Sequence, residues 1–552
     1  MHSRNPYQTP PDFEVLAAVY PPLKPHLKYT GRKLTLDQMN KTTIDYNDQE
    51  AQRRLAEALL RYTFKLHLTL PPNRLCPPIP NRLNYILWLQ DIVAAHRRSY
   101  SLVYGASRPL VYGLDIGTGA SAIYPLLGCA LDPSWRFVAT ELDPFSFDYA
   151  SQNVGNNGLG DRIRVWRVNS LEEPLFGAMK ETDEVFDFTM CNPPFYSSVQ
   201  EIEESGRNKS SPPNAICTGS ETEMITPGGE LKFISRMIQE SIHLQSRCSY
   251  FTSMVGKLST VPELVRILKG YGISNWGVTE FVQGQTRRWG VVWSFTDVRL
   301  PDSLTRITSP SPSIQASQPP WNSIHYDIIN TSTQNDGDDK VELGLSLVKN
   351  QKEKLIGMIS SLDGVRILRD YDVQPKLEFE DHQHRHRHQY QKHGNGGGNG
   401  NGDGDGNGDV TITMILVSAQ RNTWSRSARR KKRFGGTAAA ASRSGLGLVL
   451  ESGTRDMMDV GGMDRAEGSF ESSSLESSLG GAAAASEAPP EATGEKPELI
   501  CAVKWVFRSG SGDGNVGGDV GGSGVKLEFE WMYGKERALF ESFSGWVWRG
   551  VR

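Results

Sequence analysis

Apolar positions follow two alternating periods along roughly the first half of the chain. Short apolar runs that suit buried strands, such as "VYGLDIGTG" (111–119) and "EVFDFTMC" (184–191), are separated by segments whose apolar residues recur every three or four positions. Two alternating segments, 274–284 and 287–295, close the series as a hairpin. Strands that alternate with helices predict an α/β fold with a doubly wound, Rossmann-like parallel sheet, to which the hairpin adds an antiparallel strand.

Composition divides the remaining chain around this sheet. With 552 residues, the protein is long enough for two to four domains. A largely helical pattern precedes the sheet, so we assign an N-terminal helical region to 1–100 and the sheet domain to 101–300. A Ser/Pro-rich stretch, "SPSPSIQASQPP", begins at Ser309 and predicts a linker over 301–340.

The last third of the chain mixes ordered-looking fragments with low-complexity tracts. The tracts, at about 378–409 and 434–497, are rich in Gly, Asn, Ala and Ser, and we expect them to be disordered because they bury too little apolar surface. The remaining fragments predict one small α+β module over 341–552 that is interrupted by these insertions. They are a helix at 343–362, strands at 409–417, 499–508 and 525–533, and a short helix at 535–551.

Charge and cysteine content limit the classes of partner. The 60 Lys and Arg against 63 Asp and Glu give a formal net charge of −3, so any nucleic-acid affinity must come from local patches. Six cysteines are scattered without a C-x-x-C pair, which disfavours a disulfide framework and a zinc site and predicts no bound metal. Since no apolar run is long enough to span a bilayer, we expect a soluble intracellular protein without a membrane partner.

The first strand of the series ends in a glycine turn. In "LDIGTGAS" (114–121), Gly117 and Gly119 allow the backbone to approach a ligand closely, but the third glycine of the dinucleotide fingerprint is missing, which disfavours NAD. The next strand ends in Glu141, where an acidic side chain can hold ribose hydroxyls. A solvated charge at a strand end remains an alternative for Glu141. A glycine turn and a ribose acid without a phosphate cradle together suggest S-adenosylmethionine as the cofactor.

The fourth strand ends in "MCNPPFYSS" (190–198). A strand-terminating turn is the simple interpretation, since proline cannot donate to a sheet ladder. At the carboxyl end of a doubly wound sheet, however, the Asn192 oxygen and the Pro193 carbonyl can each accept one hydrogen of an exocyclic amine. Pro193 and Pro194 would hold that carbonyl in place, and Phe195 would offer a face for a flipped-out base. We therefore predict that these four residues form the catalytic motif of an amine methyltransferase.

Several segments in one order resemble the methyltransferase-like protein 16 family, whose members are RNA adenine-N6 methyltransferases that modify U6 small nuclear RNA. A bacterial ribosomal-RNA large-subunit methyltransferase F is a related protein. The resemblance covers about residues 1–300. Its segments are "MHSRN…PPDF", "NRLNYILWLQD", "LDIGTGAS…IYPLLG", "ATELD", "MCNPPF", "PGGELKFISRMI" and "TEFVQGQTRRWGVVWSF". It implies a class I methyltransferase fold, S-adenosylmethionine as cofactor and transfer of its methyl group to the N6 amine of an adenosine in structured RNA.

The resemblance also implies roles for individual residues. The position after the third strand, near Asn169 or Ser170, falls where this sequence departs from the family in length. Gln285 stands where the family often has arginine. The expected cofactor-binding residues are Arg82, Asp115, Gly117, Gly119, Ser121, Glu141, Ser170 and Asn192, and the expected RNA-binding residues are Arg4, Arg207, Lys209, Arg287 and Arg288.

Partners and location follow from the same resemblance. It implies RNA as the partner, U6 small nuclear RNA above all, a monomeric state, and a nuclear location with the cytoplasm as a further site. Relatives in animals carry a C-terminal RNA-binding module, and the predicted helices and strands after residue 340 would suit such a module. The basic run at 426–433 is either a phosphate-binding or nuclear-localisation segment or a solvated tail, and the histidine tract at 382–393 is either a metal binder or low-complexity sequence.

Two other enzyme classes and one non-enzyme remain open from the residues alone. Asn-Pro-Pro-aromatic motifs also serve glutamine-N5 methyltransferases of release factors and amino-methyltransferases of DNA. The glutamine enzymes usually have tyrosine at the fourth position, whereas this chain has Phe195 followed by Tyr196. An RNA-binding scaffold that merely keeps the fold is disfavoured by the intact glycine turn, Glu141 and Asn192.

Overall fold

The computed structural model describes most of the chain outside the low-complexity tracts. The described residues are 1–30, 41–105, 108–207, 220–284, 286–330, 338–372, 410–425, 427–428, 496–508 and 524–552. The tract expected to be disordered at 378–409 lies outside them, as does the tract at 434–497 up to residue 495. Contacts divide the chain into one unit of Met1–Arg421 with Lys496–Arg552 and a second of Asn422–Glu495, and every element below belongs to the first.

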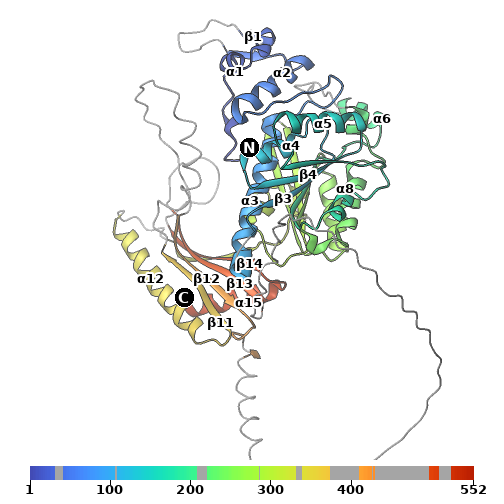
Figure 1. Cartoon of the computed structure of the whole chain (residues 1–552). Helices are drawn as coiled ribbons and strands as arrows, with labels where there is room; N and C mark the ends of the chain where they lie inside the picture. Colours follow the sequence, from blue (N-terminus) through green and yellow to red (C-terminus); the bar gives the residue numbers. More distant parts are fainter. Residues whose placement is uncertain are drawn as a thin grey trace, which may run out of the picture. The chain divides into compact units, whose positions relative to one another are not determined.

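The N-terminal region is mainly helical and leads into the sheet through one long helix (Figure 1). Asp12 and Asp48 accept hydrogen bonds from backbone N–H groups of the first turns of the two short helices, which is how a side chain caps a helix start. A small antiparallel hairpin, which the sequence analysis missed, is inserted between them. The elements are α1 (Phe13–Val19), β1 (Leu27–Thr30), β2 (Lys41–Ile44), α2 (Gln49–Leu59) and α3 (Ile79–Tyr104).

The central sheet has seven strands in the order β5-β4-β3-β6-β7-β9-β8. Its first five strands run parallel and the closing hairpin is antiparallel, with β9 between β7 and β8. The strands are β3 (Val111–Ile116), β4 (Trp135–Glu141), β5 (Ile163–Arg167), β6 (Phe186–Cys191), β7 (Cys248–Val255), β8 (Asn275–Gln283) and β9 (Thr286–Ser294). The predicted doubly wound sheet with an antiparallel addition is thus confirmed.

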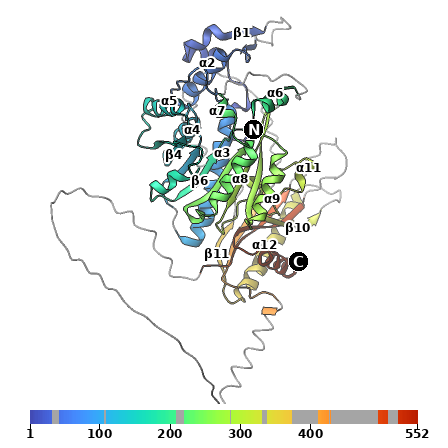
Figure 2. The same cartoon turned by 90° about the vertical axis from the view of Figure 1, so that its right-hand side faces the viewer.

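Two hydrophobic cores cover the two faces of this sheet, as alternating side chains require. Phe188 of β6 packs in one core with α3, α4 and α5, whereas Phe186 and Leu114 pack in the other with α8 and α9. Figure 2 shows these helices around β4 and β6. The helices are α4 (Ile123–Leu131), α5 (Pro144–Asn156), α6 (Val199–Arg207), α7 (Glu221–Met224), α8 (Gly229–Ser241) and α9 (Thr260–Gly270).

The strand order places a switch point between β3 and β6. The chain leaves β3 towards β4 and β5 on one side and returns to build β6 and β7 on the other side. In doubly wound sheets, ligands bind beyond the carboxyl ends of the strands at such a point. Ile116 pairs with Cys191 there, so the residues that follow β3 and β6 leave the sheet side by side.

A second sheet of five antiparallel strands follows, in the order β10-β14-β13-β12-β11. Its first strand, β10, occupies Ser323–Asn330, so the expected linker over 301–340 is wrong for these residues. β10 escaped prediction because Ser/Pro-rich sequence and polar residues flank its alternating "SIHYDIIN" pattern. The other elements are α10 (Asp302–Thr305), α11 (Pro312–Gln315), α12 (Asp338–Ser360), β11 (Val365–Asp372), β12 (Val410–Ala419), β13 (Leu499–Arg508), β14 (Gly524–Tyr533) and α15 (Arg537–Val551).

The chain between the two sheets pairs with the end of β14. The backbone N–H of Arg299 donates to the Met532 carbonyl at 2.9 Å, and the N–H of Gly534 donates to the Asp297 carbonyl at 2.9 Å. The buried Arg299 guanidinium lies 4.4 Å from the centre of the Trp531 ring. Residues 297–299, which follow the seven-stranded sheet, are therefore packed against residues 531–534 at the end of the C-terminal sheet. A flexible linker would not make such contacts.

Candidate active site

The turn after β3 has the backbone that its glycines allow. Gly117 has φ of 71° and Gly119 has φ of 66°, in the left-handed region that favours glycine. A Cβ atom at Gly117 would meet no atom within 4 Å, so the space beside this turn is open in the described part of the chain. Ser121 follows the turn and is buried ahead of α4. The turn therefore offers room for a ligand next to its backbone.

Glu141 at the end of β4 faces this turn. One carboxylate oxygen accepts a hydrogen bond from the Gly119 N–H at 2.7 Å, and the other accepts from the N–H groups of Leu142 (3.0 Å) and Asp143 (2.9 Å). Burial raises the pKa of Glu141, and these three backbone donors oppose the shift. Since a carboxylate has about four acceptor sites, room remains for one further donor without breaking an existing bond.

A buried arginine and a buried carboxyl group lie near the same turn. Arg82 of α3 donates through Nη1 to the Tyr124 hydroxyl at 2.8 Å, while its Nε has no hydrogen-bond partner among the described residues. Both carboxyl oxygens of Asp115 likewise lack a partner in the described part of the chain. Burial raises the pKa of Asp115 to about 7, and the Thr118 side chain and, to a smaller extent, the charge of Arg82 oppose this shift. Both groups retain capacity to bind a ligand.

Asn192 begins the loop after β6, as predicted. Its Oδ1 is buried and has no hydrogen-bond partner among the described residues, so a buried acceptor is left open. Phe195 lies three residues farther along the same loop, and its ring packs directly against Gly256. A Cβ atom at Gly256 would lie only 2.6 Å from that ring. The guanidinium of Arg288 lies 5.5 Å from the ring centre, at cation–π distance.

The structure brings most of the expected cofactor residues to one edge of the sheet. Arg82, Asp115, Gly117, Gly119, Ser121, Glu141 and Asn192 surround the carboxyl ends of β3, β4 and β6. Ser170 follows β5, and its hydroxyl accepts a hydrogen bond from the Glu172 N–H at 3.0 Å. Its role in cofactor binding stays a prediction.

The expected RNA-binding residues are spread over several elements. Arg4 ties the N-terminus to α3 through Asp91 at 2.5 Å and Gln90 at 2.9 Å, while Arg287 pairs with Glu280 at 3.0 Å. The side chain of Arg207, at the end of α6, and all of Lys209 lie outside the described residues. Their contacts with RNA therefore remain predictions.

One acidic residue near the glycine turn escaped the sequence analysis. Glu223 of α7 accepts hydrogen bonds from the Leu75 N–H (3.0 Å) and the Ser220 N–H (2.8 Å). Its carboxylate lies 3.7 Å from where a Cβ of Gly119 would be, and its charge contributes to the raised pKa of Glu141. No periodicity or motif marks Glu223, because its position depends on segments far apart in the sequence.

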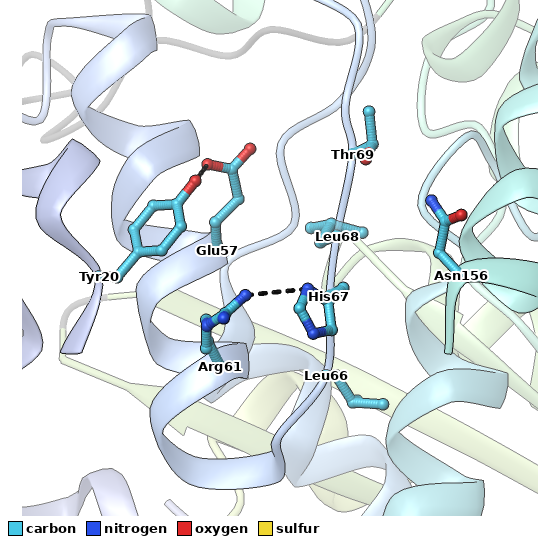
Figure 3. A pocket seen from close by; sticks show the side chains of 8 residues that line it. All are labelled: Tyr20, Glu57, Arg61, Leu66, His67, Leu68, Thr69 and Asn156. Atoms are coloured by element: carbon cyan, nitrogen blue, oxygen red, sulfur yellow. Dashed lines mark hydrogen bonds between the residues drawn. The ribbon is translucent and has the colours of Figure 1, made fainter. Parts of the chain in front are cut away.

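A separate polar hollow of about 400 Å³ lies between the N-terminal region and the end of α5 (Figure 3). The Tyr20 hydroxyl donates to Glu57 at 2.6 Å on one wall, and Arg61 bonds to Nδ1 of His67 at 3.0 Å on the other. None of the predicted site residues lines it. The residues around it are Tyr20, Glu57, Arg61, Leu66, His67, Leu68, Thr69 and Asn156.

The part of the chain that the structure describes has neither a membrane-spanning helix nor a cluster of metal ligands. Among them, no helix has the length and apolar character needed to cross a membrane. No group of three or more His, Cys, Asp or Glu side chains in these ranges is arranged to hold a metal ion. The histidine tract at 382–393 and the basic run at 426–433 lie outside the described residues, apart from 427–428.

Comparison with known proteins decides the family. A family model described as RNA methyltransferase matches residues 1–297, which is more than half of the chain. The chain belongs to this RNA methyltransferase family. The match covers the N-terminal region and the whole seven-stranded sheet but leaves the C-terminal sheet unassigned. The predicted resemblance to the methyltransferase-like protein 16 family is confirmed.

Relatives within the RNA methyltransferase family share about half of this chain. The RNA N(6)-adenosine-methyltransferase METTL16 of Mus musculus is 40% identical over 316 residues, which are 56% of this chain and 53% of the relative. The U6 small nuclear RNA (adenine-(43)-N(6))-methyltransferase of Schizosaccharomyces pombe is 40% identical over 269 residues, 49% of this chain and 66% of the relative. The chain thus spans about half the length of the mouse relative that it matches.

Solved structures of the RNA methyltransferase family also match. The N-terminal domain of human METTL16 in complex with SAH is 38% identical and covers 54% of this chain and 99% of that domain, with a TM-score of 0.43. The human METTL16 catalytic domain in complex with an RNA hairpin is 38% identical and covers 56% of this chain, with a TM-score of 0.47.

Proposed function

We propose that this chain transfers a methyl group from S-adenosylmethionine to the N6 amine of an adenosine in structured RNA, with U6 small nuclear RNA as the first candidate substrate. The observation that carries the proposal is the Oδ1 atom of Asn192, a buried acceptor without a partner among the described residues. Asn192 follows β6, the strand that pairs with β3, and the glycine turn follows β3. The family match and the activities named for the mouse and yeast relatives support the substrate class.

The polar groups around the glycine turn suit S-adenosylmethionine. Arg82, buried with its Nε unpaired among the described residues, would bind the carboxylate of the amino-acid part of the cofactor. Asp115 would accept from the ammonium group of that part, since both of its oxygens lack partners in the described ranges. Glu141 has one acceptor site left for a ribose hydroxyl, and the open space beside Gly117 admits the cofactor close to the backbone.

The residues after β6 would orient the amine that receives the methyl group. S-adenosylmethionine, when bound, supplies an electrophilic methyl group on its sulfonium. Asn192 Oδ1 and the Pro193 carbonyl would each accept one amine hydrogen, which turns the nitrogen lone pair out of conjugation with the adenine ring. The nitrogen would form the new bond to the methyl carbon as the carbon–sulfur bond breaks and its electron pair returns to sulfur, which leaves S-adenosylhomocysteine. The proton that the nitrogen then carries leaves to water. The Phe195 ring would support the flipped-out base by stacking.

RNA binding and cellular location extend this proposal. Arg4, Arg207, Lys209, Arg287 and Arg288 are the candidates for phosphate contacts. Arg288 already lies over the Phe195 ring, so it would have to share or yield that face when a base arrives. A substrate of the U6 class places the protein in the nucleus, with the cytoplasm as a further site, and we propose that it acts as a monomer.

The C-terminal sheet is the candidate for a second RNA-binding module. It lies outside the matched family region, and its edge strand β11 carries the exposed residues Arg366 and Arg369. Exposed arginines on an edge strand both discourage strand addition and offer phosphate contacts. The module would add RNA affinity to that of the catalytic domain.

Transfer of a labelled methyl group to RNA tests the proposed function. The full-length protein is incubated with tritiated S-adenosylmethionine and total RNA, and the RNA is then digested to nucleosides. We expect label in N6-methyladenosine. In parallel reactions, a release-factor protein or DNA replaces the RNA, and label in protein glutamine or in DNA there would assign the chain to another class of amine methyltransferase. Absence of label in every reaction would support a non-catalytic RNA-binding protein.

A further inference from the structure

Helix α3 sends two buried side chains, one turn apart, to two different parts of the candidate active site. Arg82 reaches Tyr124 of α4 beside the glycine turn, as described above. Tyr85 reaches the other side: its hydroxyl lies 2.8 Å from Thr252 Oγ1 of β7 and 3.4 Å from the backbone N of Cys191 at the end of β6. Both side chains are buried, and the Tyr85 ring meets the Tyr124 ring edge to face at 5.6 Å.

Donor counting fixes the direction of the hydrogen bonds around Tyr85. The Thr252 hydroxyl donates its one hydrogen to the Thr189 carbonyl at 2.7 Å. The Tyr85 hydroxyl must therefore donate to Thr252 Oγ1, which leaves its lone pairs to accept from the Cys191 N–H. A chain of three hydrogen bonds thus runs from Cys191 through Tyr85 and Thr252 back to Thr189 on the same strand.

This chain of bonds acts where the ladder between β6 and β7 ends, while β6 remains paired with β3 as far as Cys191. The register between β6 and β7 ends at the pair Thr189 and Phe251, two residues before the end of β6. Cys191 is the last residue of β6, so its N–H lies next to the peptide that leads into Asn192. Without the Tyr85 hydroxyl, the Cys191 N–H would lose this acceptor at the point where the catalytic loop begins.

We propose that Tyr85 is a positioning residue that holds the end of β6, and with it Asn192, at a fixed place relative to Arg82 on the same helix. This inference rests on the proposed methyl transfer. α3 would then align the cofactor with the Asn192 amide that binds the amine. Arg82 would hold the cofactor, and Tyr85 would hold the strand that leads into Asn192. Even a small displacement of Asn192 should lower turnover strongly. The affinity for the cofactor should change little, because Arg82 and the glycine turn stay in place.

The test compares hydroxyl deletions at buried tyrosines in the full-length protein. With transcribed U6 RNA as substrate, Tyr85→Phe should lower kcat about tenfold, because one hydrogen bond to the loop-bearing strand is lost, and should leave the Kd for S-adenosylmethionine within about twofold. Tyr124→Phe should show the opposite split, a KM for S-adenosylmethionine raised about tenfold with a smaller change in kcat. Tyr250→Phe, a buried hydroxyl deletion outside the site, should change neither.

A second pair of variants separates positioning from general stability. Thr252→Val removes the acceptor of the Tyr85 hydroxyl and should lower kcat, whereas Thr252→Ser keeps a hydroxyl and should retain wild-type turnover. Tyr85→Phe combined with Thr252→Val should lose little more than either change alone, since both break one chain of bonds. Full kcat in Tyr85→Phe, or equal turnover of the Val and Ser variants, would overturn the inference while leaving the methyl transfer of the wild type intact. No transfer by the wild type would instead refute the proposed function.

Discussion

Removing the charge of Asp115 should stabilise the cofactor-free protein at alkaline pH. Asp115→Asn keeps the shape of a side chain that is 1% exposed and has no hydrogen-bond partner among the described residues. Burial of an unpaired carboxylate is unfavourable, and here it raises the pKa of Asp115 to about 7, from an ordinary value of 3.8. The wild type carries this cost only where the group ionises, so the benefit of the variant must depend on pH.

The sign and size of the effect follow from proton linkage. A raised carboxyl pKa means that the folded state holds the proton when the unfolded state has already lost it. The stability of the wild type is therefore undiminished below about pH 4 and falls as the pH rises through the folded pKa near 7. One unit of difference between the folded and unfolded pKa is worth about 1.4 kcal/mol, so the wild type loses about 4 kcal/mol of folding stability in all. About 3 kcal/mol of this loss falls between pH 5 and pH 8. The amide that replaces the carboxyl group in Asp115→Asn does not titrate in this range.

Urea unfolding of both proteins at pH 5 and pH 8, followed by tryptophan fluorescence without cofactor, measures this difference. The free energy of unfolding of Asp115→Asn relative to wild type should rise by about 3 kcal/mol between the two pH values. The same variant should bind S-adenosylmethionine more weakly, because a neutral amide holds an ammonium group less well than a carboxylate does. A relative stability that does not change with pH would show that Asp115 is not a buried unpaired acid.

Three other changes test separate parts of the structure. Glu141→Ala should weaken S-adenosylmethionine binding about tenfold or more, because it removes a charged acceptor, and unchanged affinity by calorimetry would exclude Glu141 from the cofactor site. Gly256→Ala should lower turnover by at least about tenfold, since its Cβ would lie 2.6 Å from the Phe195 ring and displace it, and normal kinetics would show that the ring position is not needed. Cutting the chain after residue 300 should leave a cofactor-binding domain of reduced thermal stability, because Arg299 loses its backbone partner at Met532. Its RNA affinity should also fall with a log–log salt slope lower by about 0.7–0.9 per lost phosphate contact, and an unchanged slope would mean that the tail does not touch RNA.

The sheet and the place of Asn192 could be predicted from the sequence because local patterns carry them. Apolar strands alternating with helical segments determine the doubly wound topology, and the rule that ligands lie beyond carboxyl strand ends places Asn192 near Gly117. Glu141 could be placed in the same way, one strand away. The bond between Glu141 and the Gly119 N–H was not foreseen, because it depends on how closely the two loops approach.

What could not be predicted depends on contacts between distant segments. Tyr85 and Thr252 are 167 residues apart, and in their own elements they look like ordinary members of an apolar helix and a buried strand. Glu223 likewise acquires its partner Leu75 only through the folded chain. β10 was missed for a different reason, since polar flanks obscured an alternating pattern that pairs with β14 more than 190 residues later. Tertiary pairing overrides such weak local signals.

The central claim is that the Asn192 side chain presents an adenine amine to the methyl donor. The most direct test measures N6-methyladenosine by mass spectrometry in transcribed U6 RNA, after reaction with wild type and Asn192→Ala at saturating S-adenosylmethionine. Wild type should form this nucleoside, and Asn192→Ala should fall at least about a hundredfold in rate while its affinity for the cofactor stays largely intact. A variant that keeps more than about a tenth of wild-type turnover, or a methyl group found on any other nucleoside instead, would contradict the account.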